Sequence, residues 1–246
     1  MMLKLQNISK AFNTVAVLHD INLDIKKGEI VSLLGESGSG KSTILNIIAG
    51  FDEADKGKCE YNERIIFGDN IFVEPQDRHI GFVFQNYALF PHLNVEKNIV
   101  FGIEEKSKKF KKQTVESLLG LINMSGFEKK YPHQLSGGQQ QRIAIARVLA
   151  RNSELILFDE VFSSIDATLK FKLITEIKEI IKLQNKTAVF VTHSPKEAIL
   201  ISDKIAYIED GIIVQYDSPD FMKNNPKNNN VSNLFKEHLT GDINEK

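Results

Sequence analysis

The sequence predicts an α/β fold built on a parallel sheet, and two repeated patterns support this. Residues 30–34, 155–158 and 187–192 are short, almost continuously apolar runs, as expected of strands buried on both faces. Residues 43–49 and 169–181 have helical apolar spacing and follow two of those runs. Alternation of buried strands with amphipathic helices is the pattern of an α/β domain.

The composition is that of a globular protein with one large or two small domains. The 246 residues are 42% hydrophobic and 26% charged, and the net charge is -1. A near-neutral chain argues against a dedicated nucleic-acid binder. The lone Cys59 excludes an internal disulfide and a cysteine-rich metal site. No apolar run is long enough to span a bilayer or to act as a signal peptide, so we expect a cytoplasmic protein.

The first third of the chain predicts several strands. Residues 2–8 and 21–25 alternate apolar and polar side chains, as half-buried strands do. Residues 61–67 predict one short strand, and residues 80–84 predict another buried strand.

The rest of the chain predicts a helical middle, a hairpin and a loose end. Residues 86–106 look irregular, and the charge run at 104–112 reads as a solvated surface. Helical spacing follows, with one helix ending near Ala150. Residues 204–216 predict a hairpin that turns at Asp210-Gly211. Residues 221–246 are rich in asparagine and lysine and predict a weakly ordered tail.

A glycine-rich loop between the first buried strand and its helix predicts a nucleoside triphosphate site. The loop fits G-x-x-x-x-G-K-[ST] and consists of Gly35, Glu36, Ser37, Gly38, Ser39, Gly40, Lys41, Ser42 and Thr43. Glycines let successive amides point at a phosphate, and the helix N-terminus adds partial positive charge. Lys41 would reach the β- and γ-phosphates, and the Ser42 hydroxyl is a natural Mg²⁺ ligand.

An acidic pair at the end of the strand at residues 155–158 predicts the catalytic half of the site. Ligands bind at the carboxyl ends of parallel strands, so we expect Asp159 beside the phosphate loop. Asp159 would hold Mg²⁺, directly or through water, and Glu160 would orient or deprotonate the attacking water. An exposed acidic pair at a strand end is the simpler alternative.

A second loop ahead of a helix separates this chain from other proteins with a phosphate loop. It consists of Leu135, Ser136, Gly137, Gly138 and Gln139. With this loop the sequence resembles an ATP-binding cassette ATPase, the motor subunit of an ABC transporter, over residues 3–220. The resemblance implies a P-loop NTPase (RecA-like) core with an N-terminal antiparallel β-subdomain. It also implies an inserted α-helical subdomain at about residues 86–150.

The resemblance implies partners as well as ATP and Mg²⁺. Two copies of the chain would pair head to tail, and each would offer its second loop to the ATP held by the other. Integral membrane permease subunits would hold the pair at the cytoplasmic face of the inner membrane. A periplasmic or surface substrate-binding protein would act with them, and no nucleic acid is expected.

Four further residues occupy positions where the family has functional groups. Gln85 resembles the glutamine that senses Mg²⁺ and the transporter, and Asp166 resembles the aspartate at the dimer interface. His193 resembles the histidine at the γ-phosphate. Phe12 resembles the aromatic residue that stacks on adenine; the alternative is an ordinary core phenylalanine. One residue departs from the pattern: Val161 follows Glu160 where the family usually has proline, so we expect a less rigid loop.

Details of the motifs point to an importer. Residues 82–93 resemble the branch that serves periplasmic binding proteins for sugars, polyamines, sulfate and ferric iron. Residues 48–51, 139–142 and 162–164 resemble the ferric-iron importers most, so we expect ferric iron as cargo. Import of polyamine, sulfate or sugar is the alternative within this branch.

Two alternatives from other classes are less well supported by the sequence. A soluble cassette acting on DNA would insert long coiled coils between the two loops, and a ribosomal one usually carries two cassettes in one chain. A regulatory cassette that binds ATP without hydrolysing it would lack Lys41, Asp159 or Glu160, and all three are present.

Overall fold

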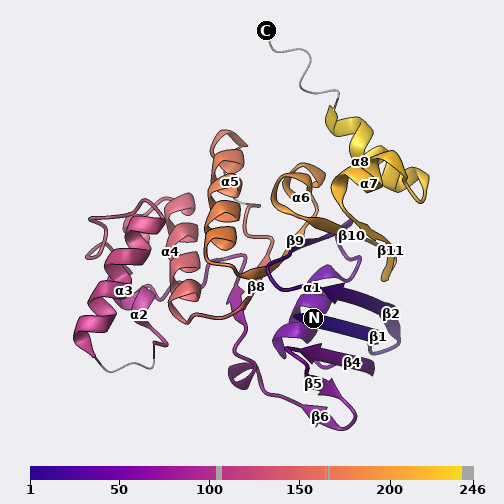
Figure 1. Ribbon diagram of the computed structural model, residues 1–246, viewed down its shortest axis with the longest axis horizontal. Coiled ribbons are helices and arrows are strands. Elements are labelled where there is room, and N and C mark those ends of the chain that lie inside the picture. Colours follow the sequence, from indigo (N-terminus) through magenta and orange to yellow (C-terminus); the bar gives the residue numbers. More distant parts are fainter. Residues whose placement is uncertain (104–106, 164, 166, 240–246) are drawn as a thin grey trace. The chain divides into compact units, whose positions relative to one another are not determined.

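The computed structural model describes residues 1–103, 107–163, 165 and 167–239, and they form two compact units (Figure 1). Unit 1 comprises Met1–His79 and Thr187–Lys246, and unit 2 comprises Ile80–Lys186. Unit 2 is therefore larger than the inserted helical subdomain expected at residues 86–150. Among the described residues, no helix is both long and apolar enough to cross a membrane.

Unit 1 contains an antiparallel sheet, as the sequence predicts for the N-terminal part. Its strand order is β2-β1-β4-β5-β6. The strands are β1 (Leu3–Phe12), β2 (Val15–Ile25), β4 (Lys56–Tyr61), β5 (Arg64–Gly68) and β6 (Ile71–Phe72). The single strand predicted at residues 61–67 is wrong. Tyr61 ends β4, and Asn62 and Glu63, with φ of 49° and 63°, turn the chain into β5.

The second sheet of unit 1 carries the phosphate loop. Within unit 1 its strands are β3 (Ile30–Leu34), β9 (Thr187–Thr192), β10 (Lys204–Glu209) and β11 (Ile212–Asp217). β3 lies between β9 and β10 and pairs parallel with both, whereas β11 pairs antiparallel with β10. Every residue of β3 and β9 is buried, as their apolar runs predict. The predicted hairpin turns at Asp210 and Gly211, which both have positive φ.

Helices of unit 1 include two in the segment predicted to be loose. The helices are α1 (Lys41–Ala49), α6 (Pro195–Ile201), α7 (Pro219–Asn224) and α8 (Asn229–Leu239), with a 3₁₀ turn at Pro75–Asp77. The prediction of a weakly ordered tail from residue 221 is wrong as far as residue 239. Val231 and Phe235 are buried on α8, and Met222 is buried on α7. A short apolar stripe among asparagines is a weak sequence signal but a sufficient packing face.

The described residues of unit 2 form a strand pair and four helices. β7 (Gly81–Val83) and β8 (Leu155–Asp159) pair in parallel. The helices are α2 (Val95–Val100), α3 (Lys108–Leu121), α4 (Gly137–Ala150) and α5 (Ala167–Leu183), with a 3₁₀ turn at Pro132–Gln134. The irregular segment predicted at residues 86–106 contains α2, which begins after Asn94. The Asn94 side chain accepts a hydrogen bond from the amide of Lys97, and six residues are too few for a periodic signal.

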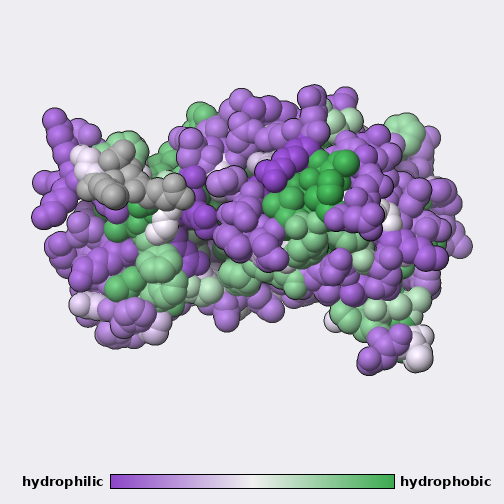
Figure 2. All heavy atoms as spheres, turned by 90° about the horizontal axis from the view of Figure 1, so that it is seen from below, coloured by the Kyte–Doolittle hydropathy of each residue, from purple (hydrophilic) through white to green (hydrophobic). Residues whose placement is uncertain are grey.

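The face drawn in Figure 2 is mainly hydrophilic, and hydrophobic side chains gather in a few patches on it. Exposed aromatic side chains belong to both units. They include Phe12 in unit 1 and Phe84, Phe101 and Phe110 in unit 2. Single exposed aromatic rings are common on protein surfaces. They indicate a function only where other candidate binding or catalytic residues lie near them.

Candidate functional site

The phosphate loop follows β3, and its first residue lies close to the backbone of β10. A Cβ atom on Gly35 would collide with the carbonyl oxygen of Ile208, so this position requires glycine. Gly38 and Gly40 have φ of 84° and 97°, which curls the chain into α1. Gly40 precedes α1 and provides no side-chain acceptor for the amides of its first turn. These amides are therefore oriented to bind an anion.

The Lys41 side chain folds back over the loop. Its ammonium nitrogen donates to the carbonyl oxygen of Glu36 at 2.5 Å and to the Ser39 hydroxyl oxygen at 3.3 Å. Lys41 is only 4% exposed. Ser42, the expected Mg²⁺ ligand, is exposed at the start of the helix, and Thr43 is half-buried. The loop thus combines the positive charge of Lys41 with the backbone amides at the N-terminus of α1.

His193 leaves the sheet next to the phosphate loop. In the parallel pair of β3 and β9, Leu34 lies opposite Thr192, so Gly35 and His193 follow a matched pair of residues. The turn after β9 is held by Thr192, whose hydroxyl donates to the Glu197 carboxylate at 2.6 Å and accepts from the Ser194 amide at 3.0 Å. The exposed His193 and the loop therefore lie at the same edge of the sheet, within unit 1.

Phe12 is not a core residue. It ends β1, its side chain is 44% exposed, and the Lys10 ammonium nitrogen lies 5.0 Å from the ring centroid. The alternative of an ordinary core phenylalanine is thereby removed. An exposed ring of this kind can stack on a planar ligand.

Unit 2 brings Gln85 close to the acidic pair. β8 is buried from Leu155 to Phe158, and Asp159 and Glu160 at its end are half-buried. Glu160 has φ of 44°, and its carbonyl accepts from the Ser163 amide at 3.1 Å and hydroxyl at 2.8 Å. The Gln85 amide nitrogen lies 3.5 Å from that hydroxyl oxygen. The neighbouring Val161 is buried.

The second loop is closed by its own side chains. Ser136 directly precedes α4 as its N-cap residue. Its hydroxyl accepts from the backbone amide of Gln139 at 3.4 Å, and the Gln139 side-chain oxygen accepts from the backbone amide of Ser136 at 2.9 Å. This reciprocal pair is a capping box. A Cβ atom added to Gly137 or Gly138 would meet no atom within 4 Å. The fold of unit 2 therefore does not require glycine at either position.

The predicted site residues are divided between the units. The phosphate loop, Phe12 and His193 belong to unit 1, whereas Gln85, Asp159, Glu160 and the loop at Leu135–Gln139 belong to unit 2. The position of Asp159 beside the phosphate loop stays a prediction. Asp166 lies outside the described residues, and so does Ser164 of the importer-like segment 162–164.

Two residues that the sequence reasoning missed organise the chain after Gln85. Asn98 on α2 is fully buried, and its amide binds the backbone of Phe90, Leu93 and Asn94 through bonds of 2.9 to 3.1 Å. Arg147 on α4 donates to the carbonyls of Ala88 at 2.6 Å and Tyr87 at 3.0 Å. Because these partners are backbone atoms, no sequence motif reveals them.

Arg78 plays a similar part in unit 1 and was also missed. It is 2% exposed, and its guanidinium donates to the carbonyls of Ile47, Ile48 and Val73 at 2.7 to 2.9 Å. Burial lowers the pKa of this side chain from its usual high value. Arg78 thereby fixes the end of α1, the helix that begins with the phosphate-loop lysine.

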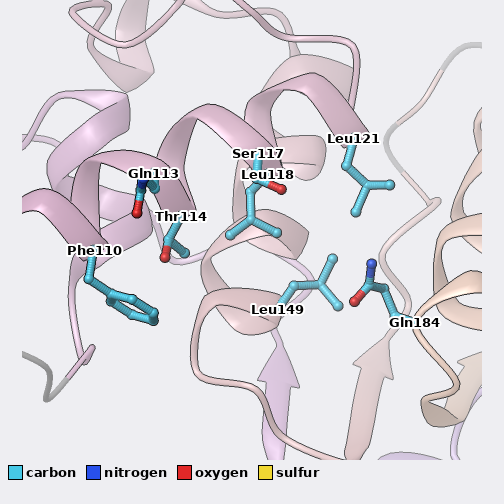
Figure 3. Close-up of a pocket in the computed structure, with 8 residues that line it drawn as sticks. All are labelled: Phe110, Gln113, Thr114, Ser117, Leu118, Leu121, Leu149 and Gln184. Carbon is cyan, nitrogen blue, oxygen red and sulfur yellow. The ribbon is translucent and has the colours of Figure 1, made fainter.

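A separate cleft of about 490 Å³ lies in unit 2 (Figure 3). One stripe of α3, from Phe110 to Leu121, forms one wall, and Leu149 and Gln184 lie opposite. The lining side chains are uncharged, and none of the predicted site residues is among them. The cleft therefore has no evident part in nucleotide chemistry.

Comparison with known proteins gives a consistent set of similarities. Residues 18–163 match the family model described as ABC transporter. The Fe(3+) ions import ATP-binding protein FbpC 2 of Haemophilus influenzae is 44% identical over 89% of this chain and 62% of its own length. The probable sulfate/thiosulfate import ATP-binding protein CysA of Chlorella vulgaris is 42% identical over 96% of this chain and 99% of its own length. The chain thus spans less than two thirds of the Haemophilus protein.

Solved structures agree with the sequence matches. A dimeric post-hydrolysis state of the ATP-binding cassette MJ0796, bound to ADP and Pi, is 34% identical with a TM-score of 0.76. The match covers 88% of this chain and 98% of that one. A second dimeric structure of MJ0796, a bacterial ABC transporter cassette, gives a TM-score of 0.77. The cassette ATPase fold implied by the sequence is confirmed by these neighbours.

Proposed function

The chain belongs to the ABC transporter family, and we propose from this that it is the ATP-hydrolysing subunit of an importer. The observation that carries the proposal is the phosphate loop of unit 1. Its helix has no side-chain cap at Gly40, and Lys41 lies over the loop. An uncapped helix N-terminus beside a fixed ammonium group is suited to a triphosphate.

The proposed reaction is attack of water on the γ-phosphorus of ATP. Lys41 and the loop amides hold the β- and γ-phosphates, and His193 donates a hydrogen bond to the γ-phosphate. Glu160 takes a proton from the water as its oxygen bonds to phosphorus. The bond to the β,γ-bridging oxygen breaks, and the products are ADP and phosphate. Phe12 stacks on the adenine ring and adds affinity without touching the reacting atoms.

The donor atoms proposed for Mg²⁺ suit that ion. Ser42 offers a hydroxyl, Asp159 a carboxylate and Gln85 an amide oxygen, and all are hard oxygen ligands. Among the described residues, no cluster of three or more His, Cys, Asp or Glu side chains could form an all-protein metal cage. A site with few protein ligands is typical of Mg²⁺ bound together with phosphates, where the ion neutralises phosphate charge.

We further propose that two copies pair head to tail with two ATP molecules between them. Ser136, Gly137, Gly138 and Gln139 of one copy would contact the ATP held by the other. The free space around Gly137 and Gly138 supports this, because glycine there leaves room for an external group. The dimeric state of the two MJ0796 cassettes supports it further.

The proposed partners are permease subunits at the cytoplasmic face of the inner membrane, acting with a substrate-binding protein. Docking would use residues 86–101, which Asn98 and Arg147 hold in one conformation. Within this segment Phe101 is 52% exposed, and its ring is tilted against that of the half-buried Phe90 with 4.2 Å between ring centroids. An exposed aromatic ring on a well-held segment can contact a short helix of a partner.

The Glu160→Gln variant tests the reaction and the dimer together. ATP hydrolysis should fall by about a hundredfold or more, because a positioned base is lost. ATP binding should remain, so size-exclusion chromatography with ATP should show a dimer. Adding Ser136→Arg places bulk and charge against the partner's ATP and should restore the monomer. Normal hydrolysis by Glu160→Gln would reject Glu160 as the base.

Ferric iron is the cargo that we propose, and sulfate is the competing candidate. The similar proteins from Haemophilus influenzae are iron-import ATP-binding proteins. Those from Bacillus cereus and Chlorella vulgaris are sulfate/thiosulfate-import ATP-binding proteins, and their identity to this chain is nearly the same. Deleting the gene should slow uptake of radiolabelled iron and leave sulfate uptake normal. The reverse result would assign sulfate.

A further inference from the structure

The helix α8 shares an apolar cluster with the strand that leads into the phosphate loop. Val231 and Phe235 on α8 are buried in one apolar cluster with Leu34 and Tyr207. Leu34 is the last residue of β3, directly before Gly35. Figure 1 shows α8 together with α7 beyond the end of β11, close to α6. Side chains from the end of the described chain therefore belong to the same apolar cluster as the last residue of the strand that precedes the nucleotide loop.

Polar contacts fix the same helix to the end of β10. The Asn228 side-chain amide donates to one carboxylate oxygen of Glu209 at 3.3 Å, and Asn230 donates to the other. The Asn228 side-chain oxygen also accepts from the amide of Val231 at 2.9 Å, at the start of α8. Both oxygens of Glu209 are thus bound by the segment that begins α8.

The end of β10 in turn lies against the phosphate loop. The carbonyl of Ile208 occupies the space that a Cβ atom of Gly35 would need. Tyr207, Ile208, Glu209 and Asp210 line one side of a hollow of about 370 Å³, and Glu36, Ser37, Gly38 and Ser39 line the other. Glu209 therefore contacts the tail and also lines the hollow beside the phosphate loop.

We propose that α8 positions the phosphate loop for ATP, and that Glu209 is the positioning residue that links them. Displacing α8 would free the end of β10 and loosen the loop before any nucleotide contact is changed. A partner or chain segment that pulls on α8 would then lower ATP affinity. The inference rests on the proposed ATP site. It adds regulation of ATP affinity through α8, which is not part of the proposed ATPase function.

Variants of the full chain test the link through nucleotide affinity. Asn230→Ala and Glu209→Ala should weaken binding of the fluorescent analogue mant-ATP about fivefold, within the range of coupling through packed networks. Glu209→Gln keeps one acceptor and should recover part of the affinity. Asn233→Ala is the matched control, because Asn233 lies on the exposed face of α8. Hydrolysis at saturating ATP should stay within about twofold of wild type, since the reacting groups are unchanged.

Hydrogen exchange separates coupling from simple loss of structure. If packing of α8 increases the affinity of the phosphate loop for ATP, bound ATP must stabilise the packed state of α8 by the same free energy, because coupling is reciprocal. Amides of residues 231–236 should exchange more slowly with mant-ATP than without it in the wild type, and this difference should vanish in Glu209→Ala. Equal exchange in the wild type with and without bound nucleotide, or unchanged affinity in both alanine variants, would overturn the inference. A wild-type chain that binds no mant-ATP would instead reject the proposed function.

Discussion

The phosphate loop and the loop at Leu135–Gln139 both begin a helix after a run of serine and glycine, yet they are built differently. At the phosphate loop, Gly40 offers no cap, Gly35 has no room for a side chain, and Gly38 and Gly40 have positive φ. At the other loop, Ser136 and Gln139 cap the helix, and Gly137 and Gly138 have free space around them. The first loop needs glycine for its own conformation and leaves its amides for a ligand. The second is complete without one, which suits a surface offered to a partner.

The largest expected effect concerns the requirement for glycine. Gly35→Ala forces a methyl group against the Ile208 carbonyl and should cost about 3 kcal/mol of unfolding free energy, as overpacking does. The melting temperature should fall by roughly 6–12 °C. Gly137→Ala should change stability by less than about 0.5 kcal/mol. Equal melting temperatures for the two variants would remove the contrast between the loops.

Loss of the loop lysine should have the next largest effect, this time on binding. Lys41→Met keeps the length of the side chain and removes the charge that we propose contacts the phosphates. ATP affinity of the isolated subunit should fall about thirtyfold, in the range for a hydrogen bond to a charged group. Calorimetric titration measures it, and Ser136→Arg serves as the control that should bind ATP normally as a monomer. If Ser136→Arg lost as much affinity as Lys41→Met, both loops would belong to one subunit's own site.

A smaller loss is expected when the exposed ring of unit 1 is removed. Phe12→Ala should weaken ATP binding about tenfold, because a base loses its stacking platform. Stability should hardly change, since the ring is 44% exposed. Phe101→Ala in unit 2 removes a similarly exposed ring and should leave ATP affinity intact. An unaltered Michaelis constant in Phe12→Ala would exclude the stacking role.

The smallest effect tests the cap of the second loop. Ser136→Ala removes the hydroxyl that accepts from the Gln139 amide and should cost about 1 kcal/mol of stability. This corresponds to a melting temperature lower by roughly 2–4 °C. Ser136→Asp keeps an acceptor at the helix start and should melt close to the wild type. A drop in Ser136→Asp as large as that in Ser136→Ala would mean that the cap does not stabilise α4.

Continuous apolar runs were predicted well from the sequence, and short elements of mixed composition were not. The buried strands β3, β8 and β9 and the end of α4 at Ala150 match their apolar patterns within a residue. The sequence reasoning missed α2, which has six residues, and merged the end of β4 with β5. The helix α2 is too short to show a helical period, and β4 lacks a continuous apolar run. The boundary between β4 and β5 depends on single residues such as Asn62. The tail helix α8 was missed because its apolar stripe is diluted by asparagine.

Some site residues could be recognised from a local motif, whereas the roles of others depend on contacts between distant parts of the chain. The phosphate loop could be located from the sequence because strand, glycines and helix start follow one another within about fifteen residues of one motif. Asn98, Arg78 and Arg147 could not, since each binds backbone carbonyls that every sequence possesses.

By itself, the sequence located a glycine-rich helix start with a lysine, because that geometry is set by neighbouring residues. It also determined the family, through the order of its motifs. Only the tertiary structure decided that Leu34 lies between Thr192 and Tyr207. It also decided that Val231 shares a cluster with Leu34 and that Asn228 binds Glu209. Those contacts join residues far apart in the chain, and they form because burying apolar faces offsets the entropy of closing long loops.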